Sequence, residues 1–315
     1  MKNDILLVGV GQLGSRYLQS LKAVKSSLNI YIVDINQSSL DLAKKRWNEI
    51  VIKQNHNCFF SKNLPKKISK FNLAIISTTA DVRLKIIKNI IPKIKVKNWI
   101  LEKILTQSIE DLEKIKELLH KQKVWVNTPD RIFNWSKKIK FNKNSIPISK
   151  CIVRGNNWGL VCNSLHLIDF FSWWTGEALI ECNAKDLDKN WFRSNRKNFI
   201  ETSGTLYFKY SGGSSLLIEC SINDAKPMSL NYQLDDWKIN KFSGYAKRND
   251  GLVVKGKIDL VSDYMTSVVE GILKDGKSDL PTLKLSYAMH KIFLGEIINS
   301  WNEINIKKKY KIPIT

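Results

Sequence analysis

The first 127 residues alternate short β-branched runs with amphipathic stretches, and this alternation constrains the fold more than any other feature of the sequence. The apolar runs lie at residues 4–10, 29–35, 73–79, 99–104 and 123–127, and stretches of helical periodicity separate them. Strands and helices that alternate in this way form a parallel sheet with helices on both faces. The sequence therefore predicts an α/β fold that begins with a doubly wound parallel sheet over residues 1–127.

The alternation of short apolar runs with helical stretches ends after Thr128-Pro129. One apolar helix is predicted around residues 162–174, and the alternating segment at residues 202–224 predicts a hairpin that turns at Gly212-Gly213. Further alternating runs follow up to residue 260, and the end of the chain is helical. We expect residues 128–315 to form a second, α+β domain with an open and largely antiparallel sheet.

A glycine-rich turn follows the first predicted strand. Gly9, Gly11 and Gly14 have the spacing of the Rossmann dinucleotide fingerprint: the first makes a tight turn, the second lets a pyrophosphate approach, and the third lets helix and strand pack. Asp34 ends the second strand, where a carboxylate accepts hydrogen bonds from the adenosine ribose and repels the 2′-phosphate of NADP. The pattern predicts NAD rather than NADP, and the alternative is a glycine turn without a ligand. The predicted cofactor-binding residues are Gly9, Gly11, Gln12, Leu13, Gly14, Asp34, Ser77, Thr78, Thr79 and Glu102.

Two later strands end in polar residues, and ligands of such folds bind beyond the carboxyl ends of the strands. Ser77, Thr78 and Thr79 end the third strand, where they could lie along a nicotinamide ribose or merely cap the next helix. Glu102 and Lys103 end the following strand. Lys103 could enter the cleft, bind a substrate hydroxyl and pass a proton, or it could be an ordinary solvated lysine.

The predicted helix around residues 162–174 carries polar groups within an apolar segment. Cys162, His166, Asp169 and Trp173 fall within roughly 60° of one another on the helical wheel. A polar stripe on a buried helix must face a polar cavity or its own hydrogen-bond partners. A histidine with a carboxylate one turn away is a candidate general acid or base, although a lone histidine is more often a satisfied core residue. Two ligands on one helix do not make a metal site, so no metal is predicted.

These motifs together resemble the Gfo/Idh/MocA family of oxidoreductases, which includes glucose-fructose oxidoreductase, inositol 2-dehydrogenase and sugar-nucleotide dehydrogenases. The resemblance rests on the glycine turn with Asp34, on Glu102-Lys103 as a match to Glu-Lys-Pro, and on residues 159–169 as a match to G-x-x-D-x-x-x-H-x-x-D. It implies that Lys103 and His166 form the catalytic pair. It also implies that Asp169 orients or supports His166.

The chain departs from the family pattern at two positions. Ile104 stands where the pattern has proline, and Cys162 stands where many members have aspartate. The substrate is then expected to contact Asn163 in addition to the catalytic pair. Residues 127–133 loosely resemble a family segment that places an asparagine and an arginine near the cleft. The predicted substrate-binding residues are accordingly Asn163, Arg131 and Asn127.

The resemblance implies an NAD(P)-dependent oxidoreductase that transfers a hydride between nicotinamide and a CH–OH carbon of a sugar or sugar nucleotide, in the synthesis of surface-polysaccharide sugars. It also implies a homodimer or homotetramer. Two alternatives stay open: a redox-assisted epimerase or lyase with tightly bound NAD, and a dinucleotide-binding regulator without turnover. Ile104 and Cys162 favour the regulator.

Composition limits the other classes. The net charge is +22, but the excess is mostly lysine spread along the chain, which is typical of a compositional bias rather than of a nucleic-acid-binding face. No uncharged apolar stretch approaches the length of a membrane span. Cys58, Cys151, Cys162, Cys182 and Cys220 form no metal-ligand spacing and fit a reducing compartment. The sequence thus predicts a cytoplasmic protein that binds neither nucleic acid nor membrane.

Overall fold

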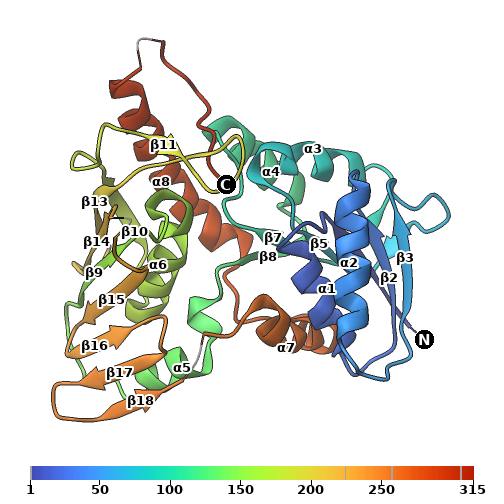
Figure 1. Ribbon diagram of the computed structural model, residues 1–315, viewed down its shortest axis with the longest axis horizontal. Helices are drawn as coiled ribbons and strands as arrows, with labels where there is room; N and C mark the ends of the chain where they lie inside the picture. Colours follow the sequence, from blue (N-terminus) through green and yellow to red (C-terminus); the bar gives the residue numbers. More distant parts are fainter. Residues whose placement is uncertain (1, 224, 257, 306) are drawn as a thin grey trace. The chain divides into compact units, whose positions relative to one another are not determined.

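The computed structural model describes residues 2–223, 225–256, 258–305 and 307–315. Residues 224 and 257, which fall within segments predicted as strands, lie outside this description. The chain divides into two compact units, coloured along the sequence in Figure 1. The first comprises Met1–Thr106, Glu113–Asn127 and Asp259–Lys284, and the second comprises Gln107–Leu112, Thr128–Ile258 and Leu285–Thr315.

The first unit contains the predicted parallel sheet. Within its described residues the strand order is β3-β2-β1-β5-β7-β8, and every pairing is parallel. The strands are β1 Asn3–Val8, β2 Leu28–Val33, β3 Asn57–Ser61, β5 Leu73–Ile76, β7 Asn98–Glu102 and β8 Lys123–Asn127, and the short strands β4 Lys70–Phe71 and β6 Lys95–Val96 pair separately. Val8 lies beside Val33 on one side and Ile76 on the other. This register brings the residues that follow β1, β2 and β5 to one edge, as the sequence predicts.

Helices of the first unit include one that the sequence-based boundary at residue 127 leaves out. They are α1 Gly14–Lys22, α2 Gln37–Glu49, α3 Ala80–Ile90 and α7 Val261–Asp275, while α4 Ile109–Leu119 has residues in both units. The α7 helix packs against α1: the Thr266 hydroxyl donates to the Ser20 carbonyl at 2.8 Å. The sequence predicts a helix in this region but does not show which segment the helix packs against. In the structure α7 belongs to the first compact unit, although it follows residue 127 in the sequence.

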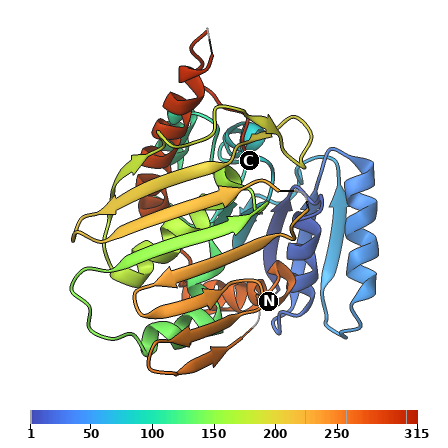
Figure 2. The same cartoon turned by 60° about the vertical axis from the view of Figure 1, so that its left-hand side comes forward.

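The second unit is built on the predicted open sheet, which Figure 2 shows from its broad side. Among the described residues the strand order is β10-β13-β14-β9-β15-β16-β17-β18, with β9 and β14 parallel and the other neighbours antiparallel. The strands are β9 Lys150–Asn156, β10 Leu179–Asn183, β13 Gly204–Tyr210, β14 Ser215–Ser221, β15 Ser229–Leu234, β16 Trp237–Asn240, β17 Tyr245–Arg248 and β18 Val253–Lys255. Strands β13 and β14 form the predicted hairpin around Gly212-Gly213. The fold class is therefore confirmed.

One face of this sheet is covered by helices of the same unit. They are the 3-10 helix η1 Pro129–Ile132, α5 Asn134–Phe141, α6 Leu160–Thr175 and α8 Leu283–Glu303, whose first two residues belong to the first unit. A short ribbon pairs β11 Phe192–Arg193 with β12 Ile200–Glu201. The Tyr210 hydroxyl donates to the Ile168 carbonyl at 3.1 Å, and the Phe171 ring meets the Tyr210 ring edge to face. These contacts fix α6, the helix of the polar stripe, on the sheet. In the described ranges no helix is long and apolar enough to cross a membrane.

Candidate active site

The glycine turn after β1 is shaped by contacts that leave no room for side chains at two of its positions. Gly9 has φ +85°, and a Cβ there would lie 2.6 Å from Thr78 Cγ2. A Cβ on Gly14 would lie 1.8 Å from the Gly9 carbonyl oxygen. A Cβ on Gly11 would meet no described atom within 4 Å. The first and third glycines thus serve the packing of the turn, and the second faces open space.

The Asp34 carboxylate ties this turn to the end of β2. Its Oδ2 accepts a hydrogen bond from the Val10 amide at 2.8 Å, and its Oδ1 accepts one from the Asn36 amide at 2.9 Å. Each carboxylate oxygen has a second lone pair. The side chain is half-buried, so those lone pairs can accept bonds from a ribose diol.

Arg46, on α2, also holds the turn and was not predicted from the sequence. Its Nη1 donates to the Gln12 carbonyl and its Nη2 to Gln12 Oε1, each at 2.6 Å. Partial burial, together with the charge of Arg16, lowers the pKa of Arg46. The neighbouring Leu13 occupies the N-cap position of α1. The Gln12 side chain therefore lies against α2, and its contact with a cofactor stays a prediction.

The three polar residues after β5 have different environments. The Ser77 hydroxyl donates to the Gly9 carbonyl at 2.6 Å, which adds a third tie to the glycine turn. The Thr78 carbonyl accepts a bond from Arg83, and Thr79 is the N-cap residue of α3 by its backbone. The Thr79 side chain makes no capping hydrogen bond with the described chain. Contact of these residues with a nicotinamide ribose stays a prediction.

Glu102 and Asn127 meet in a buried polar network within the first unit. Glu102 Oε1 accepts from the Tyr17 hydroxyl and, at 2.6 Å, from Asn127 Nδ2. The Tyr264 hydroxyl donates to Asn127 Oδ1 at 3.1 Å. Burial raises the pKa of Tyr17 well above its ordinary value, and the Glu102 charge raises it further. The network joins β7 and β8 to α1 and α7, so direct ligand contacts of Glu102 and Asn127 stay predictions.

Lys103 follows this network directly and is 9% exposed, which excludes an ordinary solvated lysine. The Lys103–Ile104 peptide bond is cis. Arg83, itself 1% exposed, donates to the Ile104 carbonyl and to the Leu105 carbonyl at 3.0 Å. Because Arg83 also binds the Thr78 carbonyl, it fixes the chain after β5 and after β7 together. This residue was not predicted from the sequence, although an arginine on the apolar side of a predicted helix is a signal of such a role.

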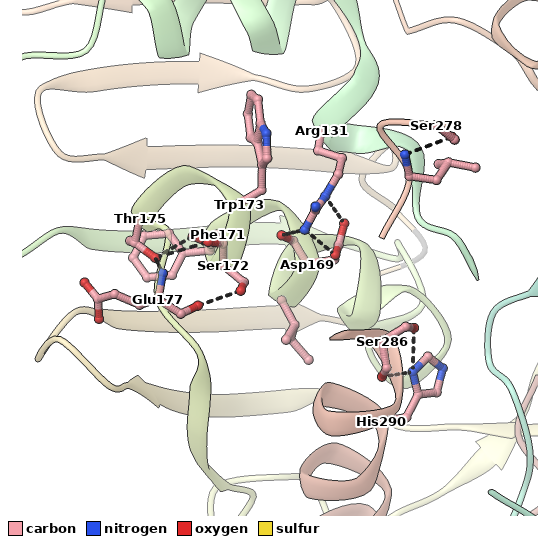
Figure 3. Close-up of polar contacts among 12 residues, drawn as sticks. Arg131, Asp169, Phe171, Ser172, Trp173, Thr175, Glu177, Ser278, Ser286 and His290 are labelled. Atoms are coloured by element: carbon pink, nitrogen blue, oxygen red, sulfur yellow. Dashed lines mark hydrogen bonds and ion pairs between the residues drawn. The ribbon is translucent and has the colours of Figure 1, made fainter. Parts of the chain in front are cut away.

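In the second unit, α6 brings the predicted stripe together with Arg131. The fully buried Asp169 accepts from Arg131 Nε at 2.8 Å and from Arg131 Nη2 at 2.6 Å, a bidentate pair that Figure 3 shows. Burial raises the pKa of Asp169 to about 6, and Arg131 opposes that rise. Both carboxylate oxygens are thus bonded to Arg131. The role of Asp169 in orienting the half-buried His166 stays a prediction.

The first turn of α6 holds the other predicted residues of this helix. Asn163 Nδ2 donates to the Trp158 carbonyl at 2.6 Å, and the Cys162 thiol donates to the Thr315 carbonyl at 2.6 Å. Both residues are half-buried. In the described ranges, no group of three His, Cys, Asp or Glu residues is arranged to hold a metal ion.

Comparison with known proteins gives the fold a clear counterpart. No protein-family model and no curated protein matches this chain. Among solved structures, an oxidoreductase from Agrobacterium radiobacter in complex with NAD+, L-tartaric acid and magnesium matches with a TM-score of 0.70 and 12% identity, over 96% of this chain and 97% of that one. Scyllo-inositol dehydrogenase from Lactobacillus casei, with NAD(H) and scyllo-inositol bound, matches with a TM-score of 0.63 and 12% identity, over 96% and 98%.

A third match is UDP-N-acetylglucosamine 3-dehydrogenase from Acidithiobacillus ferrooxidans, with a TM-score of 0.63 and 10% identity over 94% of this chain and 96% of that one. The fold is that of the Gfo/Idh/MocA-type dehydrogenases. The resemblance read from three short motifs is therefore confirmed at the level of the fold, over nearly the whole chain.

Proposed function

We propose that this protein is an NAD-dependent oxidoreductase that acts on a CH–OH carbon of a sugar or sugar nucleotide. The observation that carries the proposal is the glycine turn. Gly9 and Gly14 are required by packing, whereas Gly11 faces space that nothing in the described chain fills. A turn with this geometry at the amino end of a helix binds the pyrophosphate of a dinucleotide through backbone N–H groups.

The residues of the first unit would hold the cofactor as follows. The Gly9–Gly14 turn and α1 bind the pyrophosphate, and Asp34 accepts bonds from the adenosine ribose. A bound nicotinamide supplies the hydride acceptor or donor. The Asp34 carboxylate disfavours a 2′-phosphate, so NAD is proposed over NADP.

The proton of the substrate hydroxyl is assigned to Lys103 or His166. The ammonium group of Lys103 can bind the hydroxyl oxygen, and the imidazole of His166 can take up or return the proton as hydride moves. The solved structures bound to scyllo-inositol and named for UDP-N-acetylglucosamine support a sugar or sugar nucleotide as substrate. A place in surface-polysaccharide synthesis, a homodimer or homotetramer, and a cytoplasmic location are part of the same proposal.

NAD is expected to raise the thermal unfolding temperature of the purified protein by a few degrees at about 100 times its Kd, because a ligand that binds only the folded state adds about 2.7 kcal/mol there. NADP is expected to have a smaller effect. A thermal-shift titration with both dinucleotides, followed by a panel of polyols and sugar nucleotides, measures this. If neither dinucleotide stabilises the protein, the proposed function is wrong.

His166→Asn is expected to lower turnover at least a hundredfold while NAD still binds, because proton transfer is lost and the dinucleotide turn is untouched. His290→Asn is unsuitable as a control since His290 is buried in α8, so the exposed His120→Asn serves instead. Cys162 bonded to Thr315 and Asp169 bonded to Arg131 are the observations that favour the regulator without turnover. If the His166→Asn variant functions as the wild type does, the regulator without turnover is favoured over an enzyme. A redox-assisted epimerase or lyase would turn over substrate without releasing NADH.

A further inference from the structure

Helix α6 begins without a cap from its own sequence. Gly159 occupies the N-cap position with φ +76°, and the described chain offers no side-chain capping bond from that position. Leu160 and Val161 follow, and no acidic residue lies in the first turn. The first amide groups of a helix have no partner within the helix, and burying them unpaired is costly. The start of α6 therefore depends on a partner from another segment.

Glu201, on the short strand β12, supplies that partner. Its Oε1 accepts from the Val161 amide at 2.6 Å, and its Oε2 accepts from the Cys162 amide at 3.1 Å. The side chain is only 5% exposed. A carboxylate at this position satisfies two amides and lies at the positive end of the helix dipole. Charge-assisted bonds of this kind explain how the chain tolerates a buried glutamate here.

The local chain is fitted to this carboxylate. A Cβ on Gly159 would lie 3.2 Å from Glu201 Oε2 and 3.2 Å from Asn163 Nδ2, so a side chain at that position would crowd the contact. The Cys162 thiol bonds to the Thr315 carbonyl at 2.6 Å, which holds the same turn from a second segment. The first turn of α6 is thus fixed by two contacts from segments distant in sequence.

His166 lies one turn beyond the residue that Glu201 holds. In an α-helix the amide of residue i+4 bonds to the carbonyl of residue i, and four residues span about 6 Å along the axis. A displacement at Cys162 is therefore passed directly to His166. The carboxylate of the stripe itself, on Asp169, has both oxygens bonded to Arg131.

We infer that Glu201 is a positioning residue of the candidate active site: it holds the first turn of α6 and thereby sets the place of the His166 imidazole. This inference rests on the proposed function for its catalytic meaning. The dependence of the His166 position on Glu201 can be tested without knowing the substrate.

The test compares Glu201→Gln with Glu201→Asp and with Glu219→Gln, a control in the same unit whose carboxylate pairs with Arg154 at an exposed site. Glutamine turns one acceptor into an N–H donor that faces an amide, whereas aspartate keeps the charge on a shorter side chain. Amide exchange at Val161 and Cys162 is expected to be about tenfold faster in Glu201→Gln. In the same variant the imidazole NMR signals of His166 are expected to shift while those of His290 stay in place. In Glu201→Asp both the exchange rates and the His166 signals are expected to lie closer to the wild-type values.

Three results decide the outcome. Faster exchange together with displaced His166 signals supports the inference, and with an identified substrate it should be accompanied by a lower kcat at unchanged KM for NAD. Faster exchange with His166 signals in their wild-type positions overturns it, because Glu201 would then be a cap and nothing more. Unchanged exchange overturns it as well. NAD binding, measured on the same samples, tests the proposed function separately, since the dinucleotide turn lies in the other unit.

Discussion

Gly14→Ala is expected to lower the free energy of unfolding by at least about 3 kcal/mol, at the upper end of what overpacking costs. The added Cβ would lie 1.8 Å from the Gly9 carbonyl oxygen and 2.7 Å from Ser77 Oγ. The first of these neighbours is backbone, held in place by β1, so it cannot rotate away as a flexible side chain would. Urea unfolding of the wild type and the variant measures the loss.

Gly11→Ala is the matched control, because the same methyl group there meets no described atom within 4 Å. Its stability is expected to stay within about 1 kcal/mol of the wild type, since replacing glycine by alanine at an unstrained position has effects of that size. Its affinity for NAD is expected to fall at least tenfold, because the methyl group would occupy the space proposed for the pyrophosphate. Normal NAD affinity in Gly11→Ala would place the ligand elsewhere, and normal stability in Gly14→Ala would contradict the packing of the turn.

Local patterns predicted the parts of the molecule that local physics determines. The strand, glycine turn and helix at the start of the chain were predictable because the atoms that crowd Gly9 and Gly14 belong to the same βα unit or to the end of the adjacent strand. For Lys103 the sequence left two alternatives, a lysine in the cleft and an ordinary solvated lysine, and its 9% exposure excludes the second. The fold of the second unit followed from alternation and from the hairpin at Gly212-Gly213.

Contacts between distant segments could not be predicted in the same way. Arg131 and Asp169 were both selected as site residues, but nothing in the sequence indicated that they pair across 38 positions. Arg46 and Glu201 were missed because each binds backbone groups, and the identity of a residue does not show which backbone group it will bind. Arg83 also binds backbone carbonyls, and its place on the apolar side of a predicted helix was the one sequence signal for it. His290 was no candidate, and its ring nitrogen meets the Ser286 carbonyl at 2.8 Å within α8, as expected of a satisfied core histidine (Figure 3).

Arg131→Met is expected to lower the free energy of unfolding by about 3–5 kcal/mol at pH 7, because the fully buried Asp169 must then either stay charged without a partner or take up a proton. The loss is expected to depend on pH. Burial holds the pKa of Asp169 at about 6, above the 3.8 of an ordinary aspartate, so the folded state binds the proton more tightly than the unfolded state does. The contribution of this group to stability is therefore greatest at low pH and is lost as pH rises through about 6.

Arg131 lowers the pKa of Asp169. Removing Arg131 therefore moves the pH-dependent loss of stability to higher pH and makes that loss larger. Urea unfolding at pH 5 and pH 8 should accordingly show a smaller difference between variant and wild type at pH 5, where Asp169 is protonated. Arg154→Met is the control: its pair with Glu219 is exposed, so its cost should stay within about 1 kcal/mol and vary little over this range. An equal penalty for Arg131→Met at both pH values would mean that Asp169 is not charged and buried as the structure has it. In that case the Arg131–Asp169 pair would not be what holds the part of α6 that carries His166.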